Sequence, residues 1–272
     1  MIRKNRKTPV RSFKSHLFSA WVMLALFAFV SFIILLIVFD IAYVNKKAFY
    51  DALTSREIWA AAKLSIVTSV TTVIIGMLFA IPMGYALSRY QFPGHTFVDS
   101  IVDIPIVFPP LIIGLSLLIF FQTRIGVWME NHGVEFVYQP AGIVLCQFLA
   151  AASVGIRTVN TAFDRIDPRA EHVALTLGCT QWGAFFRVAL PMARNGIVAG
   201  AILTWARAFG IFGPLMVFVG AVRMKTEVLP TTIYLEQSIG RIEVALAVAV
   251  MMIAIAGIAL IAIRLLGLRY EF

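Results

Sequence analysis

Six long apolar runs, separated by short polar stretches, dominate this chain. A helix of about 20 apolar residues crosses the roughly 30 Å hydrocarbon core of a bilayer, and each run is about that long or longer. The pattern therefore predicts an all-α, polytopic membrane protein with about six transmembrane helices. The runs are Leu17–Phe39, Ile58–Leu87, about Ile101–Phe121, Gly142–Ala162, Gly196–Val219 and Val244–Leu266.

The chain begins with a basic stretch followed by the first apolar run. A signal peptide has an apolar core of only about 7–15 residues before a small-residue cleavage site. This run is longer and ends at Asp40 without such a site. We therefore expect a basic cytoplasmic tail (1–16), an N-terminal anchor helix with an outer loop (17–57) and a membrane core (58–272). Basic residues are more frequent in the tail and in alternate loops, which places both termini in the cytoplasm by the positive-inside rule.

Composition supports the membrane assignment. The chain is 60% hydrophobic and only 14% charged, with a mean hydropathy of +0.89, whereas a soluble domain is closer to a quarter charged. The net charge of +9 lies mostly in short loops and the tail, so the lipid bilayer, and not nucleic acid, is the expected partner. The two cysteines and four histidines lack the spacing of a metal site or a nucleophile. We expect no metal, no cofactor and no catalytic residue.

Glycines and prolines that interrupt helices cluster within the runs. Proline removes a backbone donor and bends or breaks a helix, and broken helices shape the pathways of transporters. Glycine and proline are also simply commoner in membrane helices than in soluble ones, so each site alone carries little weight. Besides Pro82, Gly84 and Pro105, the candidate pathway or gate residues are Pro109, Pro110, Gly210, Gly213 and Pro214.

Arg207 is the basic residue that the pattern places in the middle of the fifth run. A charge at the bilayer centre costs at least about 2.5–3.5 kcal/mol on insertion scales, so it should face a cavity or a partner. Two interpretations remain open. Arg207 attracts an anionic solute on the pathway, or it makes a structural contact with a carboxylate or with helix-end carbonyls.

A polar, amphipathic segment lies between the fourth and fifth runs. It predicts a short helix, a turn at Gly178, an aromatic-rich helix with Trp182, and then Leu190-Pro191 before Gly196. Gly178 and Gly183 have the glycine spacing of a phosphate-binding loop, but Ala184-Phe185 follow where that loop needs Lys and Ser or Thr. We therefore expect that the chain does not hydrolyse ATP and is not an enzyme.

This segment resembles the cytoplasmic coupling loop of permease subunits of binding-protein-dependent ABC importers. The resemblance lies in Leu177-Gly178, in the dozen residues that lead to Leu190-Pro191, and in Gly196. Two positions depart from the family pattern, because the usual glutamate falls on His172, with Glu171 one residue earlier, and Asn195 replaces a second proline. The resemblance implies a coupling loop at 164–195. Its implied contacts with the ATPase are Glu171, His172, Ala174, Gly178, Leu190, Pro191 and Gly196.

The resemblance extends from about residue 58 to the end of the chain and is strongest to the molybdate/tungstate and sulfate permeases. It includes the segments ARAFG and KTEVLPTTIYLE, although that group commonly has an acidic residue where Ile211 stands. It implies a type I ABC importer permease fold, a bacterial or archaeal cytoplasmic membrane location and an oxyanion cargo. The implied partners are two copies of an ATP-binding cassette ATPase, an extracytoplasmic solute-binding protein and a second permease subunit in a homodimer.

Several alternatives remain open at this point. The same machine could carry ferric iron, a polyamine or thiamine. A stand-alone secondary transporter would need inverted repeats and titratable groups inside the membrane, and no pair of carboxylates lies within one apolar run. An integral membrane enzyme would need a catalytic cluster at one membrane face.

Overall fold

The fold is known from a computed structural model that describes residues 13–133 and 135–265, and every regular element in these residues is helical. This confirms the all-α prediction, while residues 1–12 of the expected basic tail lie outside the described residues. The elements are α1 (Phe13–Tyr43), α2 (Lys46–Thr54), α3 (Arg56–Arg89), α4 (His95–Val107), α5 (Pro110–Gln122), α6 (Arg124–His132), α7 (Pro140–Asp164), α8 (Arg169–Thr176), α9 (Gln181–Ala184), the π-helix η1 (Phe185–Ala189), α10 (Leu190–Met192), α11 (Arg194–Phe209), α12 (Gly213–Phe218), α13 (Leu229–Ser238) and α14 (Ile242–Leu265).

Four of the helices, α1, α3, α7 and α14, are long and apolar enough to cross a membrane. Two bent pairs raise the number of candidate spans to as many as six, because α4 meets α5 at 109° and the helix from α9 to α10 meets α11 at 70°. The third predicted run is thus not one straight helix. Pro109 and Pro110 supply no backbone donors, and a residue before proline is disfavoured in the α conformation, so the break falls at Phe108–Pro109.

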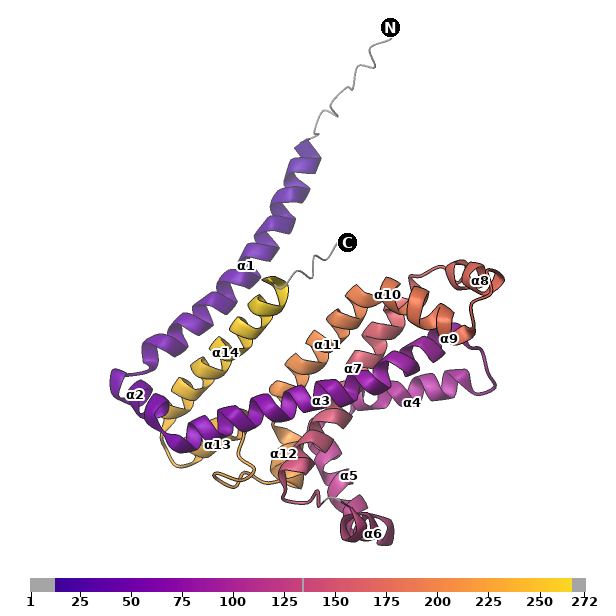
Figure 1. The fold of residues 1–272 in the computed structure, drawn as a ribbon. Coiled ribbons are helices and arrows are strands. Elements are labelled where there is room, and N and C mark those ends of the chain that lie inside the picture. The colour runs from indigo at the N-terminus through magenta and orange to yellow at the C-terminus, as the bar shows by residue number, and fades with distance from the viewer. Residues whose placement is uncertain (1–12, 134, 266–272) are drawn as a thin grey trace.

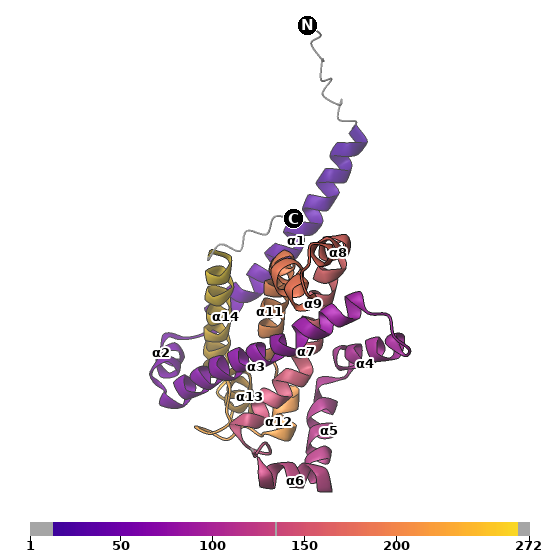
Figure 2. The same cartoon turned by 45° about the vertical axis from the view of Figure 1, so that its right-hand side comes forward.

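Helix α7 is the centre of the bundle and packs against α3, α11 and α4 (Figures 1 and 2). Around it the apolar side chains form three buried clusters. The first joins α5, α7 and α12 through Phe121, Ile143 and Phe218. The second joins α3 and α7 to the segment after α9, and the third joins α2, α3, α13 and α14.

Helix α1 stands apart from the rest of the bundle. It packs against α14 and leaves nearly all of its described side chains exposed. It continues through Asp40 to Tyr43, four residues beyond the end of the predicted run. The start of α1 and the end of α14 lie on the same side of the bundle as α8, and α6 lies on the opposite side (Figure 1).

Two long polar connections, residues 122–140 and 221–243, each contain a helix. The 122–140 stretch forms α6. Glu130 lies in this helix, and its Oε1 accepts hydrogen bonds of 2.9 Å from the backbone amides of Phe136 and Val137, which follow the helix. The 221–243 stretch forms α13, and Pro230 stands in its first turn and does not interrupt it. A proline fits there because the first amides of a helix have no partner within the helix.

Candidate functional site

The segment 164–195, here called the coupling segment, leaves the bundle at the end of α7 and returns to it at α11. It forms the predicted order of a short helix (α8), a tight turn, and a second helix from Gln181 to Met192. Thr180 is the N-cap of the second helix, and its Oγ1 accepts a hydrogen bond of 3.1 Å from the amide of Gly183.

Gly178 forms the turn between the two helices. Its φ of +91° lies in the left-handed region that favours glycine. The amide of Gly178 donates to Leu175 O at 3.0 Å, and the amide of Cys179 donates to Ala174 O at 3.0 Å. These two bonds are those of a Schellman motif, which satisfies the last carbonyls of α8 and turns the chain sharply.

The second helix of the coupling segment contains the π-turn η1. The amide of Leu190 donates to Phe185 O, five residues back. Pro191 follows at once, and it has no amide with which to continue the α-helical pattern to Arg187. The π-turn therefore coincides with the place where the proline would otherwise leave a gap in the helical hydrogen bonds.

Six large apolar side chains of the coupling segment are exposed. Four of them are Val173, Leu177, Trp182 and Phe186, with exposed fractions of 57%, 81%, 73% and 53%. The rings of Trp182 and Phe186 stack at 5.8 Å with an interplanar angle of 11°. We call these four residues the coupling patch. Exposed apolar groups that adjoin one another in this way mark a protein or membrane contact.

Glu171 has a different position from the coupling patch. Its side chain is only 8% exposed, and it accepts hydrogen bonds from Tyr85 Oη at 2.5 Å and from Arg89 Nε at 2.8 Å. Arg89 Nη2 also donates to Ile166 O at 3.0 Å. We call Tyr85, Arg89 and Glu171 the Glu171 triad; it fastens the start of α8 to the end of α3.

The sequence analysis did not identify Tyr85 or Arg89. Their spacing could have identified them, because residues four apart share one face of a helix. Both lie in the last turns of α3. A cavity of about 600 Å³ adjoins the triad between α3, α8 and α9, and Tyr90, Trp182 and Phe185 also line it.

The other predicted coupling residues are distributed over the segment. His172 is exposed beside Glu171, and Ala174 is buried beneath α8. Leu190 is half-buried and Pro191 exposed. Gly196 lies in α11, where a Cβ would come within 2.1 Å of the Cβ of Ala162, so close packing of α11 on α7 accounts for this glycine.

The fold brings the two predicted groups of helix-breaking residues together. The fifth run divides at Gly210–Phe212 into α11 and α12. A Cβ on Gly213 would lie 3.5 Å from the amide nitrogen of Leu111 and 3.6 Å from the Cβ of Pro110. The break before α5 therefore faces the break before α12. Pro109 and Gly210 are exposed beside it, and Pro214 is buried against α5.

Within the fifth predicted run, Arg207 stands close to the break at Gly210. It lies in the last turn of α11, which ends at Phe209 because the chain breaks at Gly210. Its Nε donates a hydrogen bond of 2.7 Å to Ala150 O of α7, and the carbonyl end of a helix also favours a positive charge. None of the ion pairs among the described residues includes Arg207.

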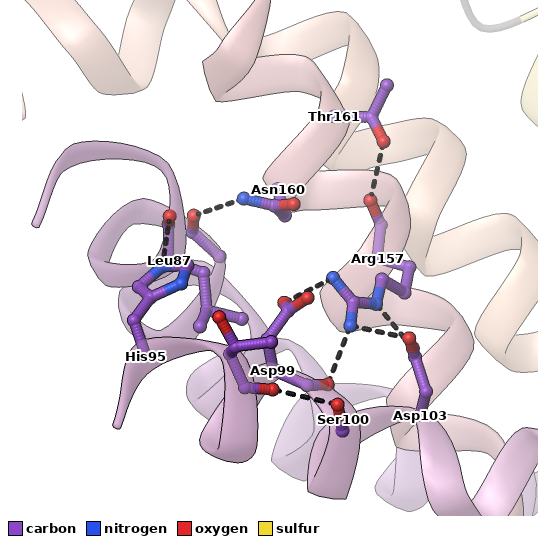
Figure 3. Close-up of polar contacts among 10 residues, drawn as sticks. Leu87, His95, Asp99, Ser100, Asp103, Arg157, Asn160 and Thr161 are labelled. Atoms are coloured by element: carbon purple, nitrogen blue, oxygen red, sulfur yellow. Dashed lines mark hydrogen bonds and ion pairs between the residues drawn. The ribbon is translucent and has the colours of Figure 1, made fainter. Parts of the chain in front are cut away.

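An ionic cluster that the sequence analysis did not identify joins α4 to α7 (Figure 3). Arg157 of α7 pairs with Asp99 and Asp103, which are four residues apart on α4. Its Nη1 lies 2.6 Å from Asp99 Oδ1, and its Nη2 lies 2.6 Å from Asp103 Oδ2 and 2.7 Å from Asp99 O. We call these three residues the Arg157 cluster. Over the described residues, no group of three or more His, Cys, Asp or Glu side chains is arranged to hold a metal ion.

Comparison with known proteins gives consistent results. Residues 73–271 match the family described as binding-protein-dependent transport system inner membrane component. The sulfate transport system permease protein CysT of Escherichia coli K12 is 29% identical over 248 residues, which cover 89% of this chain and 90% of CysT. The molybdenum transport system permease protein ModB of the same strain is 32% identical over 216 residues, 77% of this chain and 93% of ModB.

Solved structures with a similar fold are also found. A chain of a bacterial ABC transporter involved in the import of the acidic polysaccharide alginate aligns with a TM-score of 0.73 at 16% identity, over 95% of this chain and 96% of that one. A chain of the MetNI methionine ABC transporter in an inward-facing conformation aligns with a TM-score of 0.59 at 18% identity, over 78% and 97%. The predicted type I importer permease fold is thereby confirmed.

Proposed function

Because the chain belongs to the binding-protein-dependent transport system inner membrane component family and is an ABC importer permease, we propose that it imports an oxyanion. In this family separate ATPase subunits hydrolyse ATP. Membership of this family supports the importer over the two alternatives of a secondary transporter and a membrane enzyme. The proposal adds the cargo, the assembly and the surfaces through which this chain works.

The coupling patch is the observation that carries the proposed contact with the ATPase. Its four apolar side chains lie exposed on α8, on the Gly178 turn and on the helix that follows. Burying them in a cleft of a partner would remove apolar area from water at roughly 25 cal/mol per Å². Exposed His172 adjoins the patch and completes the contact surface. Glu171, which faces α3, supports α8 from beneath.

In the proposed cycle, two copies of the chain pair around a central path, and two ATPase copies seat the two coupling segments. Closure of the ATPases on ATP draws the coupling segments together and turns the permease from inward-facing to outward-facing. A solute-binding protein delivers its cargo on the other side, and ATP hydrolysis resets the complex. Such a shift requires each partner to bind the two states with different affinity.

The orientation follows from the same assembly. The coupling segment must face the cytoplasm to reach an ATPase that uses cytoplasmic ATP. The start of α1 and the end of α14 lie on the side of α8 (Figure 1), so both termini are cytoplasmic. The side that carries α6 and the loop before α13 then faces outward and receives the binding protein.

The oxyanion cargo is supported by the relatives and by Arg207. Two of the similar proteins are named sulfate and molybdenum permeases. Arg207 uses Nε for Ala150 O, which leaves its two terminal amino groups for an anion that passes the facing helix breaks. Ferric iron, polyamine and thiamine are the competing cargoes, and cationic polyamines would be repelled by this guanidinium.

The test is purification of the tagged chain in mild detergent with ATP and vanadate, with every partner identified by mass spectrometry. We expect an ATPase and an extracytoplasmic binding protein. Trp182→Ala in the coupling patch should lose the ATPase. Trp128→Ala is the matched control, because Trp128 is 61% exposed on α6, at the opposite side of the bundle.

The captured binding protein is then titrated with molybdate, tungstate and sulfate, and with ferric iron, a polyamine and thiamine as competitors. Tight binding of an oxyanion supports the cargo assignment, and tight binding of a competitor contradicts it. A chain that purifies without any ATPase contradicts the proposed assembly.

A further inference from the structure

The Glu171 triad joins the coupling segment to α3 by contacts that involve side chains. Both carboxylate oxygens of Glu171 are occupied, and Arg89 also holds the loop before α8 through Ile166 O. The side chains of Arg89 and Glu171 are 10% and 8% exposed. Charge-assisted hydrogen bonds of this kind are about twice as strong as neutral ones, so a displacement of α8 acts directly on the end of α3.

Helix α3 reaches from this triad to the opposite side of the bundle. It has 34 residues and is therefore about 50 Å long at 1.5 Å per residue. Along its length it packs against α7 and α11 (Figures 1 and 2). Those contacts support α3 as one continuous helix from Arg56 to Arg89.

The far end of α3 is also fastened, at the outer loop (residues 220–228) and at the start of α13. Glu57, in the first turn of α3, pairs with Arg223 of the outer loop, and Arg223 Nη2 pairs with Glu236 of α13 at 2.8 Å. Ser65 Oγ of α3 accepts a buried hydrogen bond of 2.8 Å from the amide of Leu229. Both ends of one helix are thus held by polar contacts to segments on opposite sides of the bundle (Figure 1).

We propose that α3 transmits the motion of the coupling segment to the outer loop, with Tyr85 and Arg89 as the positioning residues that connect Glu171 to it. This inference rests on the proposed function, because an ATPase supplies the motion. It gives Glu171 a role inside the permease in place of a direct contact with the ATPase. The conformation of the outer loop changes when α3 transmits this motion.

The alternative is that the coupling segment acts only through the chain that continues into α7 and α11. In that case the Glu171 triad stabilises the fold, and its loss lowers assembly and activity together. Transmission through α3 predicts instead that ATPase binding and ATP hydrolysis persist while the outer loop no longer responds to nucleotide.

The experiment compares Glu171→Gln, Arg89→Gln and the double variant in the complex with the ATPase that the wild-type chain captures. Each chain carries Met224→Cys, an exposed position in the outer loop, and Cys179→Ser; Cys146 is buried. The measurements are the amount of ATPase bound, the rate of ATP hydrolysis, and the maleimide labelling rate at position 224 with and without ATP and vanadate. Lys63→Gln is the matched control, since Lys63 is an exposed basic residue of the same helix α3 and lies outside the Glu171 triad.

We expect ATP and vanadate to change the labelling rate in the wild-type and Lys63→Gln chains. In each triad variant the nucleotide-dependent ratio should fall about fivefold or more, the usual size of a coupling between sites. The labelling ratio of the double variant should fall no further than that of either single variant, because all three variants break the same contact between Arg89 and Glu171. ATPase binding should persist throughout.

Two results would overturn the inference. One is a triad variant that keeps the wild-type labelling ratio, and the other is a variant that loses ATPase binding in proportion to labelling. Failure of the proposed function has a different signature, because the wild-type chain itself would then bind no ATPase.

Discussion

Gly84 of α3 and Asn160 of α7 lie where these two helices pack closely against each other. A Cβ on Gly84 would stand 2.9 Å from the backbone nitrogen of Asn160. The Asn160 side chain in turn donates a hydrogen bond of 3.3 Å from Nδ2 to Gly84 O (Figure 3). The pairing of α3 with α7 thus depends on the absence of a side chain at position 84.

Gly84→Ala should therefore destabilise the chain by about 1–3 kcal/mol, the usual cost of overpacking against backbone. Gly76→Ala in the same helix is the control, since its Cβ would meet Thr204 Cγ2 at an ordinary 3.5 Å and alanine favours a helix over glycine by up to about 1 kcal/mol. Thermal unfolding in detergent distinguishes the two. Equal melting temperatures would contradict the close-packing argument.

Arg157→Gln should loosen α4 from α7, because it removes every contact of the Arg157 cluster. We expect a loss of about 1–2 kcal/mol, below the cost of breaking a fully buried pair because Asp99 and Asp103 are partly exposed. Arg157→Lys should recover little, since one ammonium cannot replace the forked guanidinium. Limited proteolysis at the 90–94 loop measures the loosening, and full recovery in the lysine variant would contradict this geometry.

Gly178→Pro should abolish ATPase capture while the chain still inserts into the membrane. Proline fixes φ near −65°, whereas Gly178 has +91° and donates its amide to Leu175 O. The expected local cost is about 3 kcal/mol or more. Gly183→Ala is the matched control, because its Cβ would have ordinary contacts. Capture at the wild-type level by the proline variant would refute the role of this turn.

Arg207→Ala should reduce transport more than it reduces expression. The lost hydrogen bond to Ala150 O is worth about 1.5–3 kcal/mol as a contact of a charged group, which the packing of α11 on α7 tolerates. Arg207→Lys keeps the charge and should retain part of the transport. Uptake in vesicles, normalised to the inserted chain, is the measurement, and equal losses of uptake and insertion would favour the purely structural role.

Glu227 should make the outer loop less stable as the pH rises. Burial raises the pKa of Glu227 above its ordinary value of 4.5, and the hydroxyl of Thr232 and the charge of Arg223 oppose this shift. A raised carboxyl pKa means that the folded loop prefers the neutral acid. The stabilisation is complete below the ordinary pKa and is lost as the pH rises through the folded pKa.

Glu227→Gln should therefore raise the melting temperature near pH 7 and flatten its change between pH 4.5 and 7.5. The control is Glu135→Gln, an exposed carboxylate whose Oε2 accepts a bond from Gln139. Its pH dependence should match that of the wild-type chain. An unchanged slope in Glu227→Gln would show that other groups set the dependence.

Much of the fold was predictable because its signals are local in sequence. Apolar runs predicted the spans, and Gly178, followed by the aromatic residues and Leu190-Pro191, predicted the helix–turn–helix order of the coupling segment. The Pro109–Pro110 and Gly210–Pro214 groups predicted breaks, whereas Pro82 and Pro105 stand inside the continuous helices α3 and α4. The pattern also did not show that the third run folds back at 109°. Helix breaks have sequence signals, but the angle depends on what packs against the two halves.

Contacts between distant residues could not be predicted in the same way. Glu171 meets Arg89 across 82 positions, and Arg157 meets Asp99 across 58, and no periodicity links such residues. The contact of Arg207 Nε with Ala150 O, across 57 positions, is another of this kind. Sequence analysis left open whether Arg207 has a structural partner, and it could not identify which residue that is.

The π-turn at Phe185–Ala189 has a consequence for how the coupling segment tolerates change over evolution. A π-turn closes its hydrogen bond over five residues where an α-helix uses four, so it contains one residue more than a regular helix needs. Deleting one residue there would restore a regular helix and keep Trp182 and Pro191 on continuous helix. Helix α8 contains no extra residue of this kind, so a deletion within it would rotate the residues that follow by about 100°. Length variation among relatives should therefore concentrate in this turn and be rare in α8.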